Sequence, residues 1–543
     1  MPPLRSSAGL PFWARVLAWL ALLLAAGGLP GCSSLPTEVQ RPVSWALRTP
    51  ETTALGRAVA DYATRTGQRQ DSGFRLLGGT EAAYASRLAL IDAAEKTLDL
   101  QYYAILADPS TALFAQRLRA AAARGVRVRI LLDDFNTAGP NAQVLRLGFV
   151  PNIEIRLFNP LAGSRRSLAG RLLGSLGNLD RMQRRMHNKM FIADNAIGII
   201  GGRNLGDAYF GQSADSNFID VDVLAAGRIV HRMSASFDAY WNNPLAYPVA
   251  SLLTRGELDA MRRPDAPSPL PDAGPGGASP LDLSPARLTW APSLLLVDQA
   301  DKLAAEEPGA QDTVVDGLLR LMAGTRRDLF IVSPYFVPGG AMMDVLARLR
   351  AAGVRVRVLT NSLAATDAPL AHVGYARYRE RLLQIGVELY EMRAEPGPGG
   401  SALSSGSARV ARVLRRGSEG SPPRAAGAGA GSVSASRASL HAKTLVLDGS
   451  VLVVGSMNLD LRSQLQNSEV ALLIRSRALA GLALEMAAPV LAHDAYRVQL
   501  QDGRLAWLPP DGAPPHTGSE PDAGLGLQWL LRLIGPLAPD EVL

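Results

Sequence analysis

Short apolar runs alternate with helical segments along most of the chain, and this alternation occurs twice. Residues 117–119 lead through alanines into the apolar run 125–131, and residues 348–350 lead through alanines into the run 353–359. In each copy a helical pattern ends at a glycine, and a strand-like run follows. Strands that alternate with helices are typical of α/β folds. The pattern therefore predicts two α/β halves in tandem.

Other apolar runs extend the match between the two copies. Residues 100–103 and 331–336 are strand-like and lie upstream of the repeated segments, whereas residues 153–157 and 387–390 lie downstream of them. Equivalent runs in equivalent order indicate an internal duplication. Each half is expected to form an α/β sandwich.

Composition gives the borders of the two halves. A Pro- and Gly-rich stretch connects them, and a stretch rich in Gly, Ser, Ala and Arg, without periodicity, interrupts the second half. The expected division is a signal peptide 1–31, an N-terminal segment 32–85, a first half 86–261, a linker 262–288, a second half 289–495 with a flexible insertion 395–438, and a C-terminal tail 496–543.

The tail contains one strongly patterned segment, residues 525–534. Its apolar positions fit either a closing helix packed on the core or an amphipathic helix on a membrane surface. The packed helix is the favoured interpretation.

The first 32 residues have the features of a secretory signal. Arg5 and Arg15 precede an apolar core at 16–26, and Leu29 to Cys32 follow it. These last four residues resemble a bacterial lipobox, in which the cysteine is acylated. Cys32 is the single cysteine of the chain, so it forms no intrachain disulfide. A plain signal peptide or an uncleaved anchor is the alternative.

Each of these alternatives places the body of the protein outside the cytoplasm. The lipobox resemblance implies a lipid-anchored protein at the periplasmic face of a bacterial cell envelope. Ser33, in place of an aspartate after the cysteine, favours the outer membrane by the same resemblance.

Composition narrows the class of protein and of partner. The chain has 543 residues, 47% of them hydrophobic and 19% charged, which argues against wholesale disorder and against many membrane spans. The net charge of +7 favours anionic partners, such as phospholipid headgroups, a membrane surface or nucleic acid.

The chemistry is carried by a motif that occurs once in each half. The first copy consists of His187, Lys189, Asp194 and Asn204, and the second, with the same spacing, of His441, Lys443, Asp448 and Asn458. Apolar runs follow each lysine, and turn residues separate paired runs, so each motif is expected on a β-hairpin. On a strand, residues i and i+2 share a face, so each histidine projects together with its lysine. The two aspartates have the opposite parity and lie at the turns, so a structural role is expected for them.

Two hairpins brought together would gather two imidazoles, two ammonium groups and two asparagines around one point. Such a set suits a tetrahedral phosphate better than a carbonyl group. Because both copies keep the same residues at the same spacing, a single site built from both halves is expected.

The paired HxKxxxxD motifs resemble those of the phospholipase D superfamily, and the resemblance covers nearly all of residues 86–495. Residues 185–189 and 201–210 are most similar to the C-type branch of bacterial cardiolipin synthases, which are lipoproteins. This resemblance implies two halves related by a pseudo-two-fold axis, with mixed sheets flanked by helices and one shared active site. It also implies a phosphohistidine intermediate, with His187 as nucleophile and His441 as general acid and base, and no metal or other cofactor.

A nucleophilic histidine needs a carboxylate that holds its other ring nitrogen. Glu469 follows His441 where the superfamily places such a partner, and Asp220 is the choice in the first half, with Asp222 as the alternative. Ser456 has no counterpart in the first half, where Gly202 stands, so one hydroxyl contact is expected to be missing there.

The same site serves several substrates, and the expected location selects among them. A lipid-anchored enzyme meets phospholipids at high local concentration, which favours phosphatidylglycerol and phosphatidylethanolamine as substrates and cardiolipin as product. A phospholipase D that hydrolyses phospholipids to phosphatidic acid is the first alternative. A secreted nuclease using the basic segment 409–424, and a membrane-bound scaffold that only binds phosphate, are further ones. An aromatic content of 6% makes nucleic acid an improbable partner, and a monomer is expected.

Overall fold

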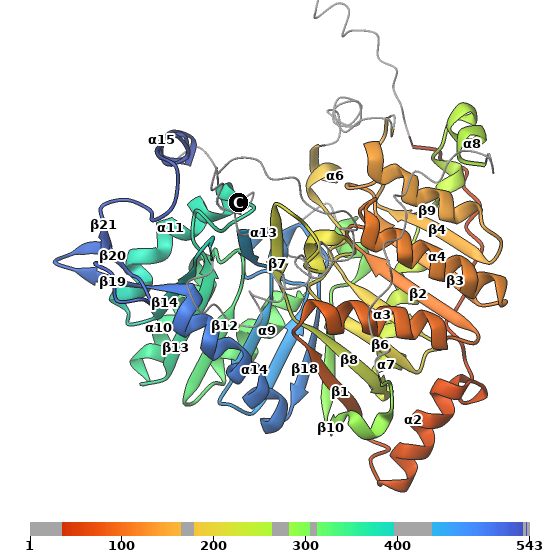
Figure 1. Ribbon diagram of the computed structural model, residues 1–543, viewed down its shortest axis with the longest axis horizontal. Helices are drawn as coiled ribbons and strands as arrows, with labels where there is room; N and C mark the ends of the chain where they lie inside the picture. The colour runs from red at the N-terminus through yellow and green to blue at the C-terminus, as the bar shows by residue number, and fades with distance from the viewer. Residues whose placement is uncertain are drawn as a thin grey trace, which may run out of the picture.

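The computed structural model describes residues 35–163, 165, 179–262, 282–304, 312–395, 437–535 and 539. The predicted signal peptide and Cys32 lie outside these residues, as do 263–281 of the expected linker and 396–436 of the expected insertion. Figure 1 shows two α/β halves side by side, the first in orange and yellow and the second in green and blue. The predicted tandem arrangement is confirmed.

Each half is built around one large mixed sheet. Among the described residues, the first sheet has nine strands, in the order β10 (Thr289–Ala291), β1 (Ser72–Leu77), β8 (Asp222–Gly227), β6 (Ile197–Gly201), β5 (Met190–Ala193), β2 (Thr97–Tyr102), β3 (Arg127–Asp133), β4 (Ile153–Phe158) and β9 (Ala246–Pro248). The neighbours β2, β3 and β4 are parallel, and the other pairs are antiparallel.

The second sheet repeats this order. Its described strands are β11 (Ser293–Val297), β18 (Val470–Arg475), β17 (Val451–Gly455), β16 (Thr444–Leu447), β12 (Asp328–Val332), β13 (Arg355–Asn361), β14 (Glu388–Met392), β19 (Ala495–Gln501), β20 (Arg504–Leu508) and β21 (His516–Thr517). Again three neighbours, β12, β13 and β14, are parallel. The strand order and directions match the first sheet from β1 to β9, as the duplicated sequence pattern predicts.

Helices cover the outer face of each sheet, and the inner faces share one core. The outer helices are α3 (Thr80–Ala93) and α4 (Pro109–Ala123) on the first sheet, and α9 (Val314–Ala323), α10 (Gly339–Ala351) and α11 (Pro369–Gln384) on the second. The core between the halves contains apolar side chains from both sheets, from α7 (Arg228–Trp241) and from α14 (Arg477–Pro489). Because both halves bury their inner faces against each other, their relative position is fixed by a continuous apolar core.

The remaining described helices are shorter or lie outside the two sandwiches. They are α2 (Ala54–Arg65), α6 (Leu179–Gln183), α8 (Arg255–Arg262), α13 (Leu461–Leu465) and α15 (Leu525–Ile534), with helical turns η1 (Pro50–Thr52), η2 (Gly139–Phe149), η3 (Asp207–Tyr209), η4 (Val249–Ser251), η5 (Pro285–Arg287), η6 (Ala300–Leu303) and η7 (Val490–Asp494). No helix in the described part of the chain has the length and hydrophobicity needed to cross a membrane.

The sheets extend past the halves marked out by composition. Strand β1 and the start of α3 precede residue 86, and β20 and β21 follow residue 495. The chain passes from the first sheet to the second at Pro292, because β10 pairs with β1 whereas β11 pairs with β18. Apolar runs in the sequence do not reveal such strands, because a strand at the edge of a sheet is short and only half buried.

The motif aspartates hold the hairpin turns to the neighbouring strands. Asp194 is fully buried, and its carboxylate accepts backbone N–H groups of residues 95, 96 and 97 at 2.8 to 2.9 Å. Asp448, which is half-buried, does the same for residues 326, 327 and 328. Each aspartate has a φ of 52°, in the left-handed region that aspartate tolerates at turns. Both carboxylates thus occupy the structural place that strand parity predicts.

Asp194→Ala is expected to lower the free energy of unfolding by about 3 kcal/mol, because one buried and two part-buried N–H groups lose their acceptor. Asp448→Ala is the matched variant, and it is expected to cost about 1 kcal/mol because water can replace the carboxylate at its more exposed turn. Denaturant titration measures both values. The folded Asp194→Ala protein should keep its turnover number, and a loss of turnover without loss of stability would give the aspartate a catalytic role instead.

Candidate active site

The two motif segments meet where the two halves join. β5 pairs with β6 and β16 pairs with β17, so each motif lies on a β-hairpin, as expected. His187 and Lys189 lie in the extended segment just before β5, and His441 and Lys443 lie just before β16. All four side chains are buried.

Backbone pairing between the halves positions the histidines. The short strand β15 (Arg437–Leu440) of the second half pairs in parallel with β7 (Ser216–Ile219) of the first, and His441 N then donates to Ile219 O at 2.8 Å. The mirror contact lies across the pseudo-two-fold axis, where His187 N donates to Ser468 O at 2.9 Å. Each histidine segment is therefore held by the half to which it does not belong.

This pairing gives each histidine a carboxylate from the opposite half. His187 Nδ1 lies 3.0 Å from Glu469 Oε1, and His441 Nδ1 lies 2.7 Å from Asp220 Oδ2. The expectation that each half supplies the carboxylate for its own histidine is wrong, although both carboxylates were correctly chosen. Asp222, the alternative in the first half, forms an ion pair with Arg87 at 3.0 Å and does not contact a motif histidine.

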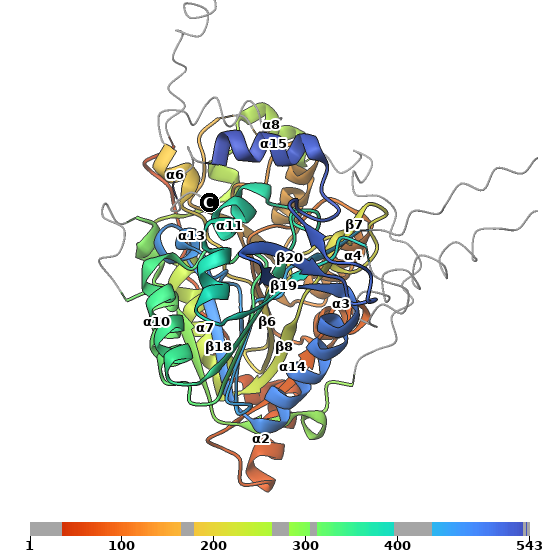
Figure 2. The same ribbon diagram turned by 90° about the vertical axis from the view of Figure 1, so that its left-hand side faces the viewer.

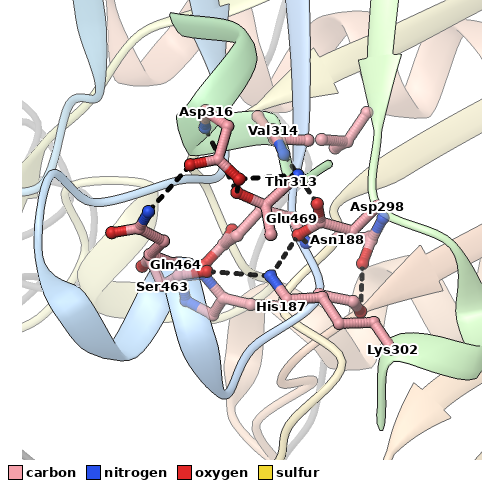
Figure 3. A network of polar contacts seen from close by, with 12 residues as sticks. His187, Asn188, Asp298, Lys302, Thr313, Val314, Asp316, Ser463, Gln464 and Glu469 are labelled. Carbon is pink, nitrogen blue, oxygen red and sulfur yellow. Dashed lines mark hydrogen bonds and ion pairs between the residues drawn. The ribbon is translucent and has the colours of Figure 1, made fainter. Parts of the chain in front are cut away.

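Glu469 lies in a network of polar contacts, which Figure 3 shows in part. Ser456 Oγ donates to Glu469 Oε2 at 2.5 Å, and Ser463 Oγ donates to Oε1 at 3.0 Å. Glu469 N donates to Asp298 Oδ2 at 3.0 Å, and Lys302 Nζ donates to the same oxygen at 2.7 Å. This network fixes the rotamer of Glu469 and, through it, the ring of His187.

The first half cannot repeat the serine contact, for a steric reason. A Cβ atom at Gly202 would lie 2.5 Å from Asp220 Oδ1, so a side chain at that position would overlap with the carboxylate. A serine at position 202, equivalent to Ser456 in the second half, would therefore not fit beside Asp220. Its counterpart, Ser456, acts on Glu469 and does not line the cavity.

The histidines face a cavity of about 440 Å³ between the halves. Its lining residues are Tyr103, Arg185, His187, Asn204, Tyr209, Tyr335, Asp367, Ala368, Pro369, Leu370, Ala371, His441, Asn458, Asp460, Arg462 and Asn467. Since Nδ1 of each histidine is bonded to a carboxylate, Nε2 is the nitrogen available to a reactant. The sequence therefore placed both histidines and both motif asparagines correctly in one site.

The motif lysines and asparagines have distinct places around this cavity. Lys189 Nζ donates to His187 O at 2.7 Å, and Lys443 Nζ donates to His441 O at 2.5 Å, so each ammonium group lies beside its own histidine. Asn204 accepts from Ala104 N at 3.1 Å and so is held by backbone. The Oδ1 atom of Asn458 is buried without a protein partner.

Sequence reasoning missed several polar groups of the cavity wall. Arg185 forms an ion pair with Asp133 at 3.3 Å, and Tyr335 donates to Asp367 at 2.8 Å. Asp133 ends β3, and the carboxyl edge of parallel strands is where α/β proteins place their sites. That position could have marked Asp133 as a candidate. Within the described residues, no cluster of three His, Cys, Asp or Glu side chains could hold a metal ion.

Burial controls the protonation of the two histidines. Burial lowers the pKa of His187 to about 4, although Glu469 opposes it, and burial also lowers the pKa of His441. Burial alone would raise the pKa of Glu469, but the facing His187 and Lys189 outweigh it and lower this pKa to about 2. At neutral pH His187 is therefore a neutral imidazole that donates Nδ1–H to a carboxylate, which leaves the Nε2 lone pair free.

Burial also lowers the pKa of Lys189 to about 7, and that of Lys443 below its usual value. Burial raises the pKa of Asp220, against the opposing effect of Lys443. The two carboxylates thus differ, since Glu469 stays ionised over a wider pH range than Asp220. An anion that enters the cavity would favour the charged form of both lysines.

The pH dependence of kcat/KM follows from these shifts. His187 can act as a nucleophile only above its pKa of about 4, so activity should fall as the pH drops through that value. The Lys189 ammonium is present below its pKa of about 7, so activity should also fall as the pH rises through that value. Lys189→Arg is expected to move the alkaline limb to higher pH, because a guanidinium group stays charged. An alkaline limb that stays in place would show that a group other than Lys189 causes it.

Comparison with known proteins agrees with this geometry. The family model described as the phospholipase D-like domain of cardiolipin synthase matches residues 88–241, 318–401 and 416–487, which together are more than half of the chain. The chain belongs to the phospholipase D superfamily. It is an enzyme of this superfamily, of the phosphatidyl-transferring kind.

Individual relatives support the same membership. Cardiolipin synthase C of Escherichia coli K12 is 36% identical over 446 residues, which cover 78% of this chain and 86% of the relative. Cardiolipin synthase A of Pseudomonas entomophila is 26% identical over 412 residues, which cover 75% of this chain and 66% of the relative. The crystal structure of phosphatidylserine synthase from Haemophilus influenzae superimposes with a TM-score of 0.55 at 14% identity, over 89% of this chain and 99% of the other. This last likeness concerns the fold.

Proposed function

We propose that the protein is a cardiolipin synthase that moves a phosphatidyl group from one phospholipid to phosphatidylglycerol through a phosphohistidine at His187. The observation that carries the proposal is the pair of buried histidines on one cavity, each with Nδ1 bonded to a carboxylate of the other half. The 36% identity to a cardiolipin synthase supports the choice of substrate class.

In the first step, His187 Nε2 attacks the phosphorus of the donor phospholipid. The anionic phosphate of the bound donor favours the imidazolium form of His441, which then carries a proton on Nε2. A P–N bond forms, the P–O bond to the headgroup alcohol breaks, and His441 Nε2 gives the alcohol this proton. Glu469 stabilises the positive charge that develops on the imidazole of His187, because it is ionised and bonded to Nδ1.

In the second step, a glycerol hydroxyl of phosphatidylglycerol attacks the same phosphorus. His441 takes the hydroxyl proton, the P–N bond breaks, and two phosphatidyl groups are then joined through one glycerol. With phosphatidylethanolamine as donor, the by-product is ethanolamine; with a second phosphatidylglycerol, it is glycerol. Both steps are displacements at one phosphorus and need no redox partner.

Positive charge around the cavity suits the negative charge of this phosphorus centre. Arg185 and Arg462 lie on the cavity wall together with Asp367 and Asp460. The ammonium groups of Lys189 and Lys443 are buried beside the histidines. Fixed charges in a buried site stabilise developing charge without reorganising at the moment of reaction.

A lipid assay tests the proposal. The protein is incubated with phosphatidylglycerol, with and without phosphatidylethanolamine and without added divalent metal, alongside His187→Ala and His441→Ala. Cardiolipin that appears only when both histidines are present is the expected result. Phosphatidic acid as the sole product would make the enzyme a hydrolase, and absence of both products would direct the search to nucleic acid substrates.

The two halves of one chain are expected to form one complete site. Mixing His187→Ala protein with His441→Ala protein should therefore restore no activity, because the core between the halves blocks their exchange. Cardiolipin formation by the mixture, measured against each variant alone, would show instead that halves of different chains combine.

The proposed location follows from the sequence around Cys32. The acylated cysteine would hold the enzyme at the periplasmic face of the cell envelope, in the outer membrane, where its phospholipid substrates are concentrated. Incorporation of radiolabelled palmitate into the wild-type chain, and not into Cys32→Ala, would support this anchor. Recovery of the wild-type protein in a soluble fraction would overturn it.

A further inference from the structure

Helix α15 exposes an apolar face that its own packing does not use. Leu525, Trp529 and Leu533 are four residues apart and share one side of the helix, and Leu530 lies next to them. These four side chains are between 52% and 75% exposed. Large apolar side chains gathered on one surface commonly mark an interaction site.

The opposite side of α15 packs on α11. Leu531 and Gln528 are buried there, Arg377 on α11 donates to Gly535 O at 2.5 Å, and Val373 lies close to Gly535. The helix therefore closes onto the second half, as the favoured interpretation of its sequence expects. The helix nevertheless has a second apolar side, formed by the four exposed residues, which faces outward.

Exposed apolar side chains concentrate near the active site. Among the described residues, nine large hydrophobic side chains are exposed, and four of them belong to α15. A fifth, Leu370, lies on the first turn of α11 and lines the catalytic cavity. Leu370 and the four α15 residues are named the docking face from here on.

The docking face and the cavity lie on one side of the molecule. α11 begins at Pro369 on the cavity wall, and α15 packs against the next turns of the same helix. In Figures 1 and 2, α15 lies near the top of the molecule, next to α11. A space of about 550 Å³ between α11 and α15 has a lining that includes Leu531, Val373, the cations Arg377 and Arg532, and the acidic Glu520.

The chemistry of α15 fits a bilayer surface. Arg532 is its single charged residue, and the helix contains no acidic one. Tryptophan favours the boundary between headgroups and acyl chains, and basic side chains attract anionic headgroups. Phosphatidylglycerol supplies both the acyl chains and the negative charge.

We propose that the docking face inserts into the boundary between headgroups and acyl chains of a phospholipid bilayer and directs the mouth of the catalytic cavity toward the lipid headgroups. This rests on the proposed function for the identity of the surface. An acyl tether would keep the enzyme near a membrane without orienting it, whereas a docked α15 fixes which side faces the lipid. Phospholipid headgroups then reach the histidines without leaving the membrane surface.

Depth-dependent quenching tests the contact directly. Because Cys32 is the single cysteine, the full chain with Cys32→Ala can carry one label, at Leu533→Cys on α15 or at Leu482→Cys on α14. Leu482 is the matched control, since it is also exposed and belongs to α14, which lies well below α15 in Figure 2. With phosphatidylglycerol vesicles containing spin-labelled acyl chains, strong quenching at residue 533 and little at residue 482 is expected. Equal quenching at both positions would overturn the proposal.

Kinetics separates docking from catalysis. The triple variant Leu525→Ser, Trp529→Ser and Leu533→Ser is compared with the control Leu294→Ser and Leu482→Ser, which removes exposed leucines elsewhere. Cardiolipin formation on vesicles should fall at least about tenfold in the triple variant, while formation from short-chain phosphatidylglycerol below its micelle concentration is retained. The control should match the wild type on both substrates.

The remaining outcomes are also decisive. Loss of activity on both substrates would mean that α15 supports the fold, and unchanged activity on vesicles would overturn docking. A wild-type dimer that becomes monomeric in the triple variant, seen by light scattering, would show that a second copy covers this face. If the wild type makes no cardiolipin from either substrate, the proposed function fails, whereas the quenching at residue 533 is still measured.

Discussion

His187→Ala should lower cardiolipin formation by about 10⁶-fold, because it removes the atom that bonds to phosphorus. His441→Ala should lower it by about 10⁴-fold, because the headgroup alcohol must then leave without a proton. The two variants differ in what they accumulate. With a phosphatidyl ester of p-nitrophenol, whose leaving group departs as an anion, His441→Ala should release one equivalent of p-nitrophenol and retain the phosphatidyl group on His187. Mass spectrometry of the quenched protein measures that adduct.

His187→Gln serves as a second variant that keeps a polar side chain in the buried position. It should release no burst of p-nitrophenol, and its thermal unfolding should stay close to that of the wild type. An adduct on His441 in the His187 variants would exchange the roles of the two histidines. The near symmetry of the two motifs makes this the alternative that the experiment has to exclude.

The sequence was sufficient to predict most of the fold and of the site, because the chain contains two copies of the same pattern and each copy can be compared with the other. A single HxKxxxxD motif is short enough to occur by chance. A second copy with the same spacing, in a half with the same predicted strands, is strong evidence for a functional site. Strand periodicity then placed Asp194 and Asp448 at turns. All of these inferences use residues that are close in sequence, where local geometry decides the outcome.

The crossed pairing of His187 with Glu469 and of His441 with Asp220 could not be inferred in this way. It depends on β15 of one half pairing with β7 of the other, across more than 200 residues of chain. Neither strand differs in pattern from a strand that pairs within its own half. The steric conflict between a side chain at position 202 and Asp220 cannot be inferred from the sequence either, because it depends on distances in the assembled site.

The crossing has a functional consequence for the two halves. Because each motif histidine is bonded to a carboxylate of the opposite half, neither half alone contains a complete histidine–carboxylate pair. The shared core and the shared site therefore depend on the same interface. Small movements between the halves would change the orientation of both imidazoles at once, whereas Asp298 and Lys302 hold Glu469 within its own half.

Exchanging each carboxylate for its amide separates the two crossed pairs. Glu469→Gln should lower the rate of the p-nitrophenol burst by about 10³- to 10⁴-fold, because a neutral amide cannot stabilise the imidazolium that forms on His187 during attack. Asp220→Asn should leave that burst nearly unchanged, since p-nitrophenol needs no proton from His441. The same variant should slow cardiolipin formation from phosphatidylglycerol by about 10²- to 10⁴-fold, because there the acid is required.

The matched pair of variants makes the assignment independent of general damage to the site. Both replacements keep the size of the side chain, and both carboxylates are fully buried, so a nonspecific effect should affect the burst equally in the two proteins. If Asp220→Asn abolished the burst and Glu469→Gln spared it, each carboxylate would serve the histidine of its own half or the histidines would have exchanged roles. The position of the trapped adduct, on His187 or on His441, distinguishes these two explanations.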